Sequence, residues 1–306
     1  MDRLATRGGS ECPVCGHTVE RAVDLGDYQL FRCRQCRCWS SDALRREAAT
    51  SFAPSDYFEH ADTDRDKWRT LLARLGDRPA PGRVLDVGCG TGAFLEFMGH
   101  TFDGLHREGV ELDPSRAAQA RARNTGARIH VGDAWQVLHE LSGPFDVVTL
   151  WDVFEHVTAP RALLGELARV LAPDGVIYIQ TIHERSLLPL LGRFAYAVSG
   201  GRLRYPVRRT HDAHHLVFFT VGGLRLLADG AHLRVRDTWY DRLARTRMDG
   251  HPVVTALASA ALRVENALGG GLFVNVLLES PPAADASPSG GDFSPPHDQA
   301  SRRARG

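Results

Sequence analysis

The chain has almost no lysine, since Lys67 is the only one among its 306 residues and arginine supplies the other positive charges. It has no net charge, with 37 Lys and Arg against 37 Asp and Glu, which excludes a protein acting mainly as a basic coat on nucleic acid. It has no apolar run of about 18 residues, which excludes a membrane span, and no apolar signal segment near Met1. These absences predict a cytoplasmic protein with no membrane partner.

The remaining composition is ordinary for a globular protein, with 43% hydrophobic and 24% charged residues. The length indicates one large domain with an appendage, or two modest domains. From Pro281 onward Pro, Ser, Ala and Gly predominate, and Phe293 is the one large apolar residue. Such a segment buries too little to offset its ordering entropy, so we expect a disordered tail over 281–306.

Five of the six cysteines lie between Cys12 and Cys38. Four cysteines leave no open coordination position on zinc, so we predict a structural zinc ribbon over 1–45. Disulfides are not expected in a cytoplasmic protein, and Cys38 stays open as a substitute for Cys36. Two CxxC pairs supply the predicted tetrahedral site: Cys12, Cys15, Cys33 and Cys36.

A regular alternation of strand and helix patterns follows the cysteines. An amphipathic stretch around Trp68 predicts a helical linker over 46–80, and extended segments near 233–240 and 273–278 end the pattern. The spacing favours a parallel sheet with helices on both faces. Short apolar runs predict its strands at 84–87, 109–112, 129–131, 145–151 and 176–181.

The segment from Val84 to Gly92 carries the pattern D-x-G-x-G-x-G, which starts at Asp86. Its glycines allow a tight strand-to-helix turn and the close approach of a ligand to free N–H groups. A GxGxxA dinucleotide fingerprint also fits these glycines with Ala93. Asp86 argues against it, because its carboxylate would repel a pyrophosphate but could bind an amino group.

With these motifs in order, the region from about Arg83 to Glu279 resembles the class I S-adenosylmethionine-dependent methyltransferases, in particular bacterial members with an N-terminal zinc ribbon. The resemblance implies an α/β fold over 81–280, with a Rossmann-like seven-stranded, mostly parallel sheet and helices on both faces. It implies that the last strand, at 273–278, is antiparallel. It also implies S-adenosylmethionine as the cofactor.

The same resemblance implies roles in the cofactor site. The glycine loop would hold the amino-acid end of S-adenosylmethionine. Glu111 would accept hydrogen bonds from both ribose hydroxyls, and Asp133 would contact the adenine amino group. Trp151 and Asp152, after the fourth strand, would line the pocket. The full predicted set is Asp86, Gly88, Cys89, Gly90, Gly92, Glu111, Leu112, Asp133, Ala134, Trp151 and Asp152.

Methyl transfer to a hydroxyl also needs a base, and histidine suits neutral pH. His156 ends the segment from Trp151, which resembles the E-x-x-E-H stretch of ubiquinone-biosynthesis O-methyltransferases, in which a metal is implicated. Here Asp152 replaces the first glutamate, and Asp152, Glu155 and His156 could gather a divalent cation. The alternative is that this segment has no catalytic role, with an acidic side chain at a helix N-terminus and a histidine that packs against aromatic residues.

His215 is the second catalytic candidate. It lies within 211–220, which resembles the H-x-x-F segment before a helix in zinc-ribbon methyltransferases, although a histidine there could simply cap or pack. We expect His211 and His214 to be solvated. His183, at the end of the fifth strand, is a weaker candidate that faces the same cleft.

Charge is distributed unevenly along the chain. Residues 184–249 hold 12 Arg against 6 acids, whereas residues 83–174 hold 8 against 13. We expect an inserted substrate cover over 183–216, which suits an anionic small-molecule acceptor unless its arginines are only solvated. O-methylation is the favoured reaction.

Two other functions stay open, which are RNA methylation and a non-catalytic module that binds the cofactor only to fold. No Asn-Pro-Pro-Tyr motif follows the fourth strand, so nucleic acid is not an expected partner. The oligomeric state is left undetermined.

Overall fold

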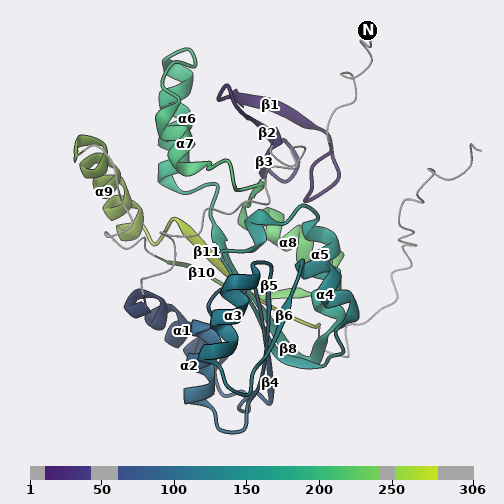
Figure 1. Ribbon diagram of the computed structural model, residues 1–306. Helices are drawn as coiled ribbons and strands as arrows, with labels where there is room; N and C mark the ends of the chain where they lie inside the picture. The colour runs from purple at the N-terminus through teal and green to yellow at the C-terminus, as the bar shows by residue number, and fades with distance from the viewer. Residues whose placement is uncertain (1–10, 43–60, 242–251, 282–306) are drawn as a thin grey trace, which may run out of the picture.

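The computed structural model describes residues 11–42, 61–241 and 252–281. The tail predicted to be disordered lies outside these ranges from residue 282 onward. Two β-sheets organise the described chain (Figure 1). The larger has seven strands: β4 (Arg83–Val87), β5 (His106–Glu111), β6 (Arg128–Val131), β7 (Phe145–Trp151), β8 (Leu171–Ile182), β10 (Arg234–Asp241) and β11 (Phe273–Glu279).

These strands lie in the order β10-β11-β8-β7-β4-β5-β6. β11 runs antiparallel to both of its neighbours, and the remaining pairs are parallel. The predicted seven-stranded, mostly parallel sheet with an antiparallel last strand is therefore confirmed. Because the chain moves outward from β4 in both directions, this topology favours ligand binding at the carboxyl ends of the central strands.

β8 differs from its predicted extent because it begins at Leu171. The turn expected at 173–175 is an irregularity within the strand, where the pairing with β7 shifts between Phe145 and Val147. A Cβ added at Gly175 would lie 2.8 Å from the Phe145 carbonyl oxygen, so this close approach requires glycine.

Helices cover both faces of the large sheet, as predicted (Figure 1). One face carries α1 (Ala61–Leu75), α2 (Ala93–Thr101) and α3 (Pro114–Arg123), and the other carries α4 (Ala134–Glu140), α5 (Pro160–Arg169) and α8 (Val221–Gly230). Trp68 and Met98 are buried in the first core, and Leu163 and Leu227 in the second. Each such fully buried side chain contributes about 1.5–3 kcal/mol to stability.

The smaller sheet has the strand order β1-β2-β3-β9. Its first three strands, β1 (Val19–Asp24), β2 (Gln29–Cys33) and β3 (Trp39–Ser41), come from the cysteine-rich ribbon. The fourth, β9 (Val217–Phe218), comes from far along the chain and pairs Val217 with Ser40 and Phe218 with Trp39. This pairing, which was not predicted from the sequence, joins the ribbon to β9, the strand that follows the expected cover.

The predicted cover region contains two helices, α6 (Leu187–Val198) and α7 (Tyr205–Thr210), which project beyond the large sheet beside β1 (Figure 1). The hydroxyl of Tyr196 on α6 donates to Asp24 O and accepts from Asp24 N, both at 3.1 Å. Beside α6 lies α9 (Pro252–Ala267), whose Glu265 Oε1 accepts a hydrogen bond from Leu187 N at 2.9 Å. No helix among the described residues has the length and apolar character needed to cross a bilayer.

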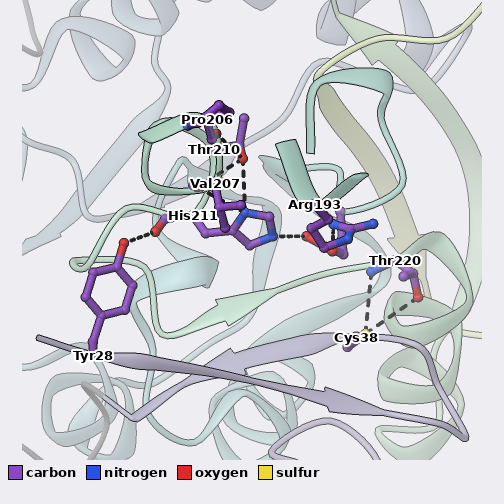
Figure 2. Close-up of polar contacts among 9 residues, drawn as sticks. Tyr28, Cys38, Arg193, Pro206, Val207, Thr210, His211 and Thr220 are labelled. Carbon is purple, nitrogen blue, oxygen red and sulfur yellow. Dashed lines mark hydrogen bonds and ion pairs between the residues drawn. The ribbon is translucent and has the colours of Figure 1, made fainter. Parts of the chain in front are cut away.

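A buried polar network joins the ribbon, the cover and the sheet (Figure 2). Glu184 is 1% exposed, pairs with Arg193 and lies 2.9 Å from His211 Nε2. The Arg193 guanidinium lies over the Trp39 ring at 4.6 Å, and Tyr28 donates to the His211 carbonyl at 2.5 Å. His211 is fully buried, so the expectation that it is solvated is wrong; the Glu184 carboxylate supplies the partner that its ring needs away from water.

Replacing Glu184 by glutamine should destabilise the protein by about 3 kcal/mol, because Arg193 would keep a largely buried position without its carboxylate. Glu20→Gln is the matched control, since Glu20 pairs with Arg34 on the ribbon surface and such exposed pairs contribute under about 1 kcal/mol. Urea unfolding measures both variants. Equal losses would show that the buried network does not stabilise this junction.

Candidate functional site

The four cysteines of the two CxxC pairs meet within the ribbon. Their sulfurs lie within 4.8 Å of one another, with Cys12 to Cys36 at 3.5 Å and Cys15 to Cys33 at 3.4 Å. Zn–S bonds of about 2.3 Å place tetrahedral sulfurs about 3.8 Å apart, so small side-chain rotations fit these residues to zinc. Cys38 contacts Thr220 and is not part of the group, so Cys36 is its fourth cysteine.

A cleft of about 760 Å³ opens at the carboxyl ends of β4 to β7, and we call it the carboxyl-edge cleft. His156 lines it, together with His214 and Leu216 from the segment before β9. Asp86, Cys89 and Gly92 do not line it. The other predicted cofactor residues all do: Gly88, Gly90, Glu111, Leu112, Asp133, Ala134, Trp151 and Asp152.

The glycines of the loop after β4 serve different purposes. Gly88, Gly90 and Gly92 all have positive φ, at 73°, 54° and 79°. A Cβ at Gly88 would lie 2.4 Å from Val153 Cγ2, and one at Gly92 would lie 2.5 Å from Asn124 Nδ2, so these two glycines permit the packing of the loop. A Cβ at Gly90 would meet no atom within 4 Å. Gly90 therefore keeps open the space that a ligand would occupy.

Glu111, at the end of β5, has a carboxylate that the backbone holds in place. Its Oε2 accepts from Gly90 N at 2.8 Å, and its Oε1 accepts from Asp113 N at 2.9 Å. The side chain is buried at the wall of the cleft. Each oxygen keeps a further lone pair, so this carboxylate can accept hydrogen bonds from two neighbouring hydroxyls of a ligand.

Asp133 caps α4 with one carboxylate oxygen, which accepts from Trp135 N at 2.9 Å and from Gln136 N at 3.4 Å. Leu112 and Trp135 present large apolar surfaces to the same cleft, at 58% and 43% exposure. Together these side chains suit a flat apolar ring that bears an amino group. Trp135 is not among the residues predicted from the sequence, although an aromatic residue two positions after a helix N-cap at the strand edge is a usable signal.

Asp86 lies beneath the loop rather than in the cleft. It is 2% exposed, and its Oδ1 accepts from Thr149 Oγ1 at 2.7 Å. Burial raises the pKa of Asp86 to about 7, and the Glu111 carboxylate adds to the rise while the Thr149 hydroxyl opposes it. A cationic group bound in the cleft would lower this pKa again.

Trp151 and Asp152 form the junction after β7. Asp152 has a φ of 52°, a left-handed conformation that is uncommon outside glycine, and its N–H donates to Gln180 O at 3.2 Å. The Trp151 ring packs 4.3 Å from Tyr178 and 5.3 Å from Phe94, measured between ring centroids. Strained backbone of this kind concentrates at functional sites, where the surrounding packing sustains it.

The two predicted catalytic histidines lie together, with the ring centroids of His156 and His215 4.7 Å apart. His156 ends the short helix η3 (Phe154–His156), and its Nδ1 lies 2.9 Å from His214 O. A carbonyl only accepts hydrogen bonds, so Nδ1 carries the proton and Nε2 bears the lone pair. Burial lowers the pKa of His156, which keeps the ring neutral at physiological pH. The His214 side chain is 47% exposed, as expected.

Glu155 completes a group of three, because its carboxylate and the rings of His156 and His215 offer ligand atoms within 4.8 Å of one another. Burial raises the pKa of Glu155 to about 8, with the Asp152 charge adding to it, and burial lowers the pKa of His215 to about 3. Within the described ranges, Glu155 Oε1 and His215 Nδ1 are buried and have no hydrogen-bond partner. The structure thus places His215 in this group rather than the predicted Asp152.

His183 faces a different space from the one expected. It lines a cavity of about 680 Å³ with Arg37, Arg185 and Tyr240, which we call the ribbon cavity, and it does not line the carboxyl-edge cleft. The expectation that it shares the cleft with His156 is therefore wrong, because His183 at the end of β8 packs against Tyr240 of β10. Burial lowers the pKa of His183 to about 4.

Comparison with known protein families adds to this geometry. Residues 57–238 match a family described as a methyltransferase domain. The match covers the glycine loop, the carboxyl-edge cleft and both histidines. The cysteine ribbon lies before its first residue.

Among individual proteins, the chain is 35% identical to a ubiquinone biosynthesis O-methyltransferase of Maricaulis maris over 149 residues, which are 46% of this chain and 56% of that protein. It is 31% identical to the same-named protein of Xanthomonas axonopodis over 173 residues, 55% of this chain and 68% of that protein. A solved methyltransferase from Archaeoglobus fulgidus is 18% identical, with 72% of this chain and 94% of that chain covered and a TM-score of 0.49.

Proposed function

We propose that this chain, which belongs to the class I S-adenosylmethionine-dependent methyltransferases, transfers the methyl group to an oxygen atom of a small-molecule acceptor. The observation that carries the oxygen assignment is the His156 ring in the wall of the carboxyl-edge cleft, whose Nδ1–H donates to His214 O and whose lone pair therefore lies on Nε2. A hydroxyl acceptor needs a base of this kind. The similar proteins of Maricaulis and Xanthomonas are named O-methyltransferases, which supports the same choice.

In this proposal the cleft residues hold S-adenosylmethionine. Glu111 accepts hydrogen bonds from the two ribose hydroxyls, and Asp133 accepts one from the adenine amino group. Leu112 and Trp135 pack against the adenine ring. Gly90 leaves room for the amino-acid end, and the buried Asp86 carboxylate stabilises its positive charge from beneath the loop. The cofactor supplies an electrophilic methyl group, so the protein's contribution is largely alignment.

The acceptor hydroxyl is deprotonated by His156 as it attacks. Nε2 takes the proton of the hydroxyl, and S-adenosylmethionine, when bound, would supply the methyl group that the acceptor oxygen receives. The His214 carbonyl, which accepts from Nδ1–H at 2.9 Å, fixes the tautomer and stabilises the imidazolium that results. His156 is thus the catalytic residue, and His215, whose ring packs against that of His156, positions it.

Glu155, His156 and His215 are also the residues that would hold a divalent cation, and His156 would then bind the cation through Nε2 in place of acting as the base. Two neutral imidazoles and a carboxylate form a suitable donor set, and two of their buried polar atoms are otherwise unsatisfied among the described residues. A cation bound there would lower the pKa of an acceptor hydroxyl and restore the charge of Glu155.

We further propose that Cys12, Cys15, Cys33 and Cys36 hold a structural zinc ion and that the ribbon contributes to acceptor binding. Arg37, which directly follows the fourth cysteine, lines the ribbon cavity with Arg185, and no acidic residue lines it. Guanidinium groups pair well with carboxylates and phosphates, so an anionic acceptor is favoured.

Replacing His156 by alanine should lower kcat by about 10²- to 10⁴-fold and leave the Kd of S-adenosylhomocysteine unchanged, because the ring acts on the acceptor. The assay measures release of S-adenosylhomocysteine across a panel of hydroxylated carboxylates and phosphates. His100→Ala on the exposed surface of α2 is the control. Full turnover by His156→Ala would contradict the role of His156 as the base. Turnover with amine acceptors alone would contradict methyl transfer to oxygen.

A further inference from the structure

One surface of the cover is apolar and open to solvent, and we call it the apolar face. Phe194 and Val198 on α6 are 65% and 67% exposed, and Leu268 just after α9 is 82% exposed. The Glu265–Leu187 hydrogen bond joins α9 to the start of α6. Most of the large exposed hydrophobic side chains of the described chain lie here: Leu190, Leu191, Phe194, Val198, Leu203, Tyr205, Val264 and Leu268.

Helix α6 is divided cleanly between an inner and an outer side. Pro189 and Gly192 are buried, Arg193 reaches Glu184, and Tyr196 reaches Asp24, so these positions face the protein. At about 100° per residue, the outer positions fall within an arc of about 120° on the opposite side. They are Leu190, Leu191, Phe194, Ala197 and Val198, and none of them is polar.

The border of the apolar face is basic. Residues 185–211 contain six arginines and no aspartate or glutamate; Arg193 and Arg208 pair with acids elsewhere, and Arg185 lines the ribbon cavity. Arg202 and Arg204, between α6 and α7, are exposed, and so is Arg263 on α9. The one acid in 256–270 is Glu265, which is buried at 8% exposure and bonded to Leu187 N.

On the ribbon side of this border, two described acids, Asp24 and Asp27, lie beside arginines. Asp27 pairs with Arg208, and Asp24 lies 4.0 Å from Arg21. They therefore leave the positive charge of the outer border in place. The apolar face thus combines an apolar helical stripe with a cationic rim.

We propose that the apolar face docks on an anionic phospholipid surface. A helix that lies in a bilayer interface needs an apolar side to enter the acyl region and arginines at its edge to meet the headgroups, and this face supplies both. A second copy of the chain fits less well, because its apolar face carries the same positive border, and the one acid in 256–270 on this side, Glu265, is buried and already bonded. Docking on a membrane surface does not require a membrane-spanning helix, so the lack of one among the described residues is compatible with this proposal.

The test is flotation of the full-length, zinc-loaded chain with vesicles of phosphatidylcholine alone or mixed with phosphatidylglycerol. We expect binding to the mixed vesicles, little binding to phosphatidylcholine alone, and weaker binding as salt rises. Replacing Phe194 and Val198 together by glutamate should weaken the partition at least about tenfold. Replacing Arg202 and Arg204 together by glutamine should weaken it about thirtyfold.

Leu226→Glu is the matched control, because Leu226 is a similarly exposed leucine on α8, outside the apolar face. It should bind mixed vesicles like the parent chain. Zinc content and S-adenosylhomocysteine binding confirm that each variant is folded. Equal binding to both vesicle types, no binding to either, or a dimer in sedimentation that the Phe194 and Val198 variant abolishes would each overturn the proposal.

Discussion

Replacing Gly90 by leucine is expected to weaken binding of S-adenosylhomocysteine by about a hundredfold or more, equal to about 3 kcal/mol. The added side chain would enter the space where a Cβ meets no protein atom within 4 Å, and that space is part of the carboxyl-edge cleft. The fold should survive, because the cost of a leucine at a φ of 54° is about 1–2 kcal/mol. Isothermal titration calorimetry and thermal unfolding measure the two effects separately.

Gly104→Leu is the matched control for this experiment. Gly104 has a φ of 72°, and a Cβ there also meets nothing within 4 Å, but it lies in the turn before β5, away from the cleft. It should lose the same stability and keep its affinity. If both variants bound the ligand as the parent does, the cofactor would have to lie elsewhere.

Removing zinc is expected to have the largest effect on stability. Cys33→Ser should lose the metal and unfold the ribbon, since structural zinc contributes about 10–16 kcal/mol of binding free energy in small zinc domains. Its loss would deprive β9 of its partner β3, and β9 follows His215 and Leu216 directly. Methyl transfer should therefore fall together with zinc content, as measured by elemental analysis and by release of S-adenosylhomocysteine.

Cys38→Ser separates loss of the metal from loss of a buried thiol. Cys38 is 1% exposed in the same ribbon, and its sulfur contacts Thr220 and is not a member of the four-cysteine group. This variant should keep its zinc and most of its activity. If Cys38→Ser lost zinc and Cys36→Ser kept it, the fourth ligand would be Cys38 and not Cys36.

The large sheet and the cleft were predictable because their signals are local. Each parallel strand is a short apolar run, and the glycine loop requires its positive φ values within five residues. Glu111 is the last residue of its strand, and Asp133 follows its strand after a single glycine. In such a fold, the ends of neighbouring parallel strands meet at one edge. A reader of the sequence therefore needs only local patterns to place these groups together.

The parts that could not be predicted depend on contacts between distant segments. His211 was assigned to solvent because nothing near it in sequence reveals that Glu184 and Trp39 enclose it. His215, rather than Asp152, joins Glu155 because the segment before β9 folds back onto η3, where Leu216 N donates to Glu155 O at 2.8 Å. Such contacts follow from tertiary packing and leave no periodic trace in the sequence.

The pairing of β3 with β9 has a consequence for the order of folding during synthesis. The four cysteines are all present once residue 36 has been made, whereas the strand that completes their sheet is made some 180 residues later. Until then the ribbon exposes β3 as an unpaired edge, and forming that contact requires closing a very long loop. The proposed zinc site can thus form early, while the last strand of its sheet and the histidines beside that strand are added only when most of the methyltransferase domain has emerged from the ribosome.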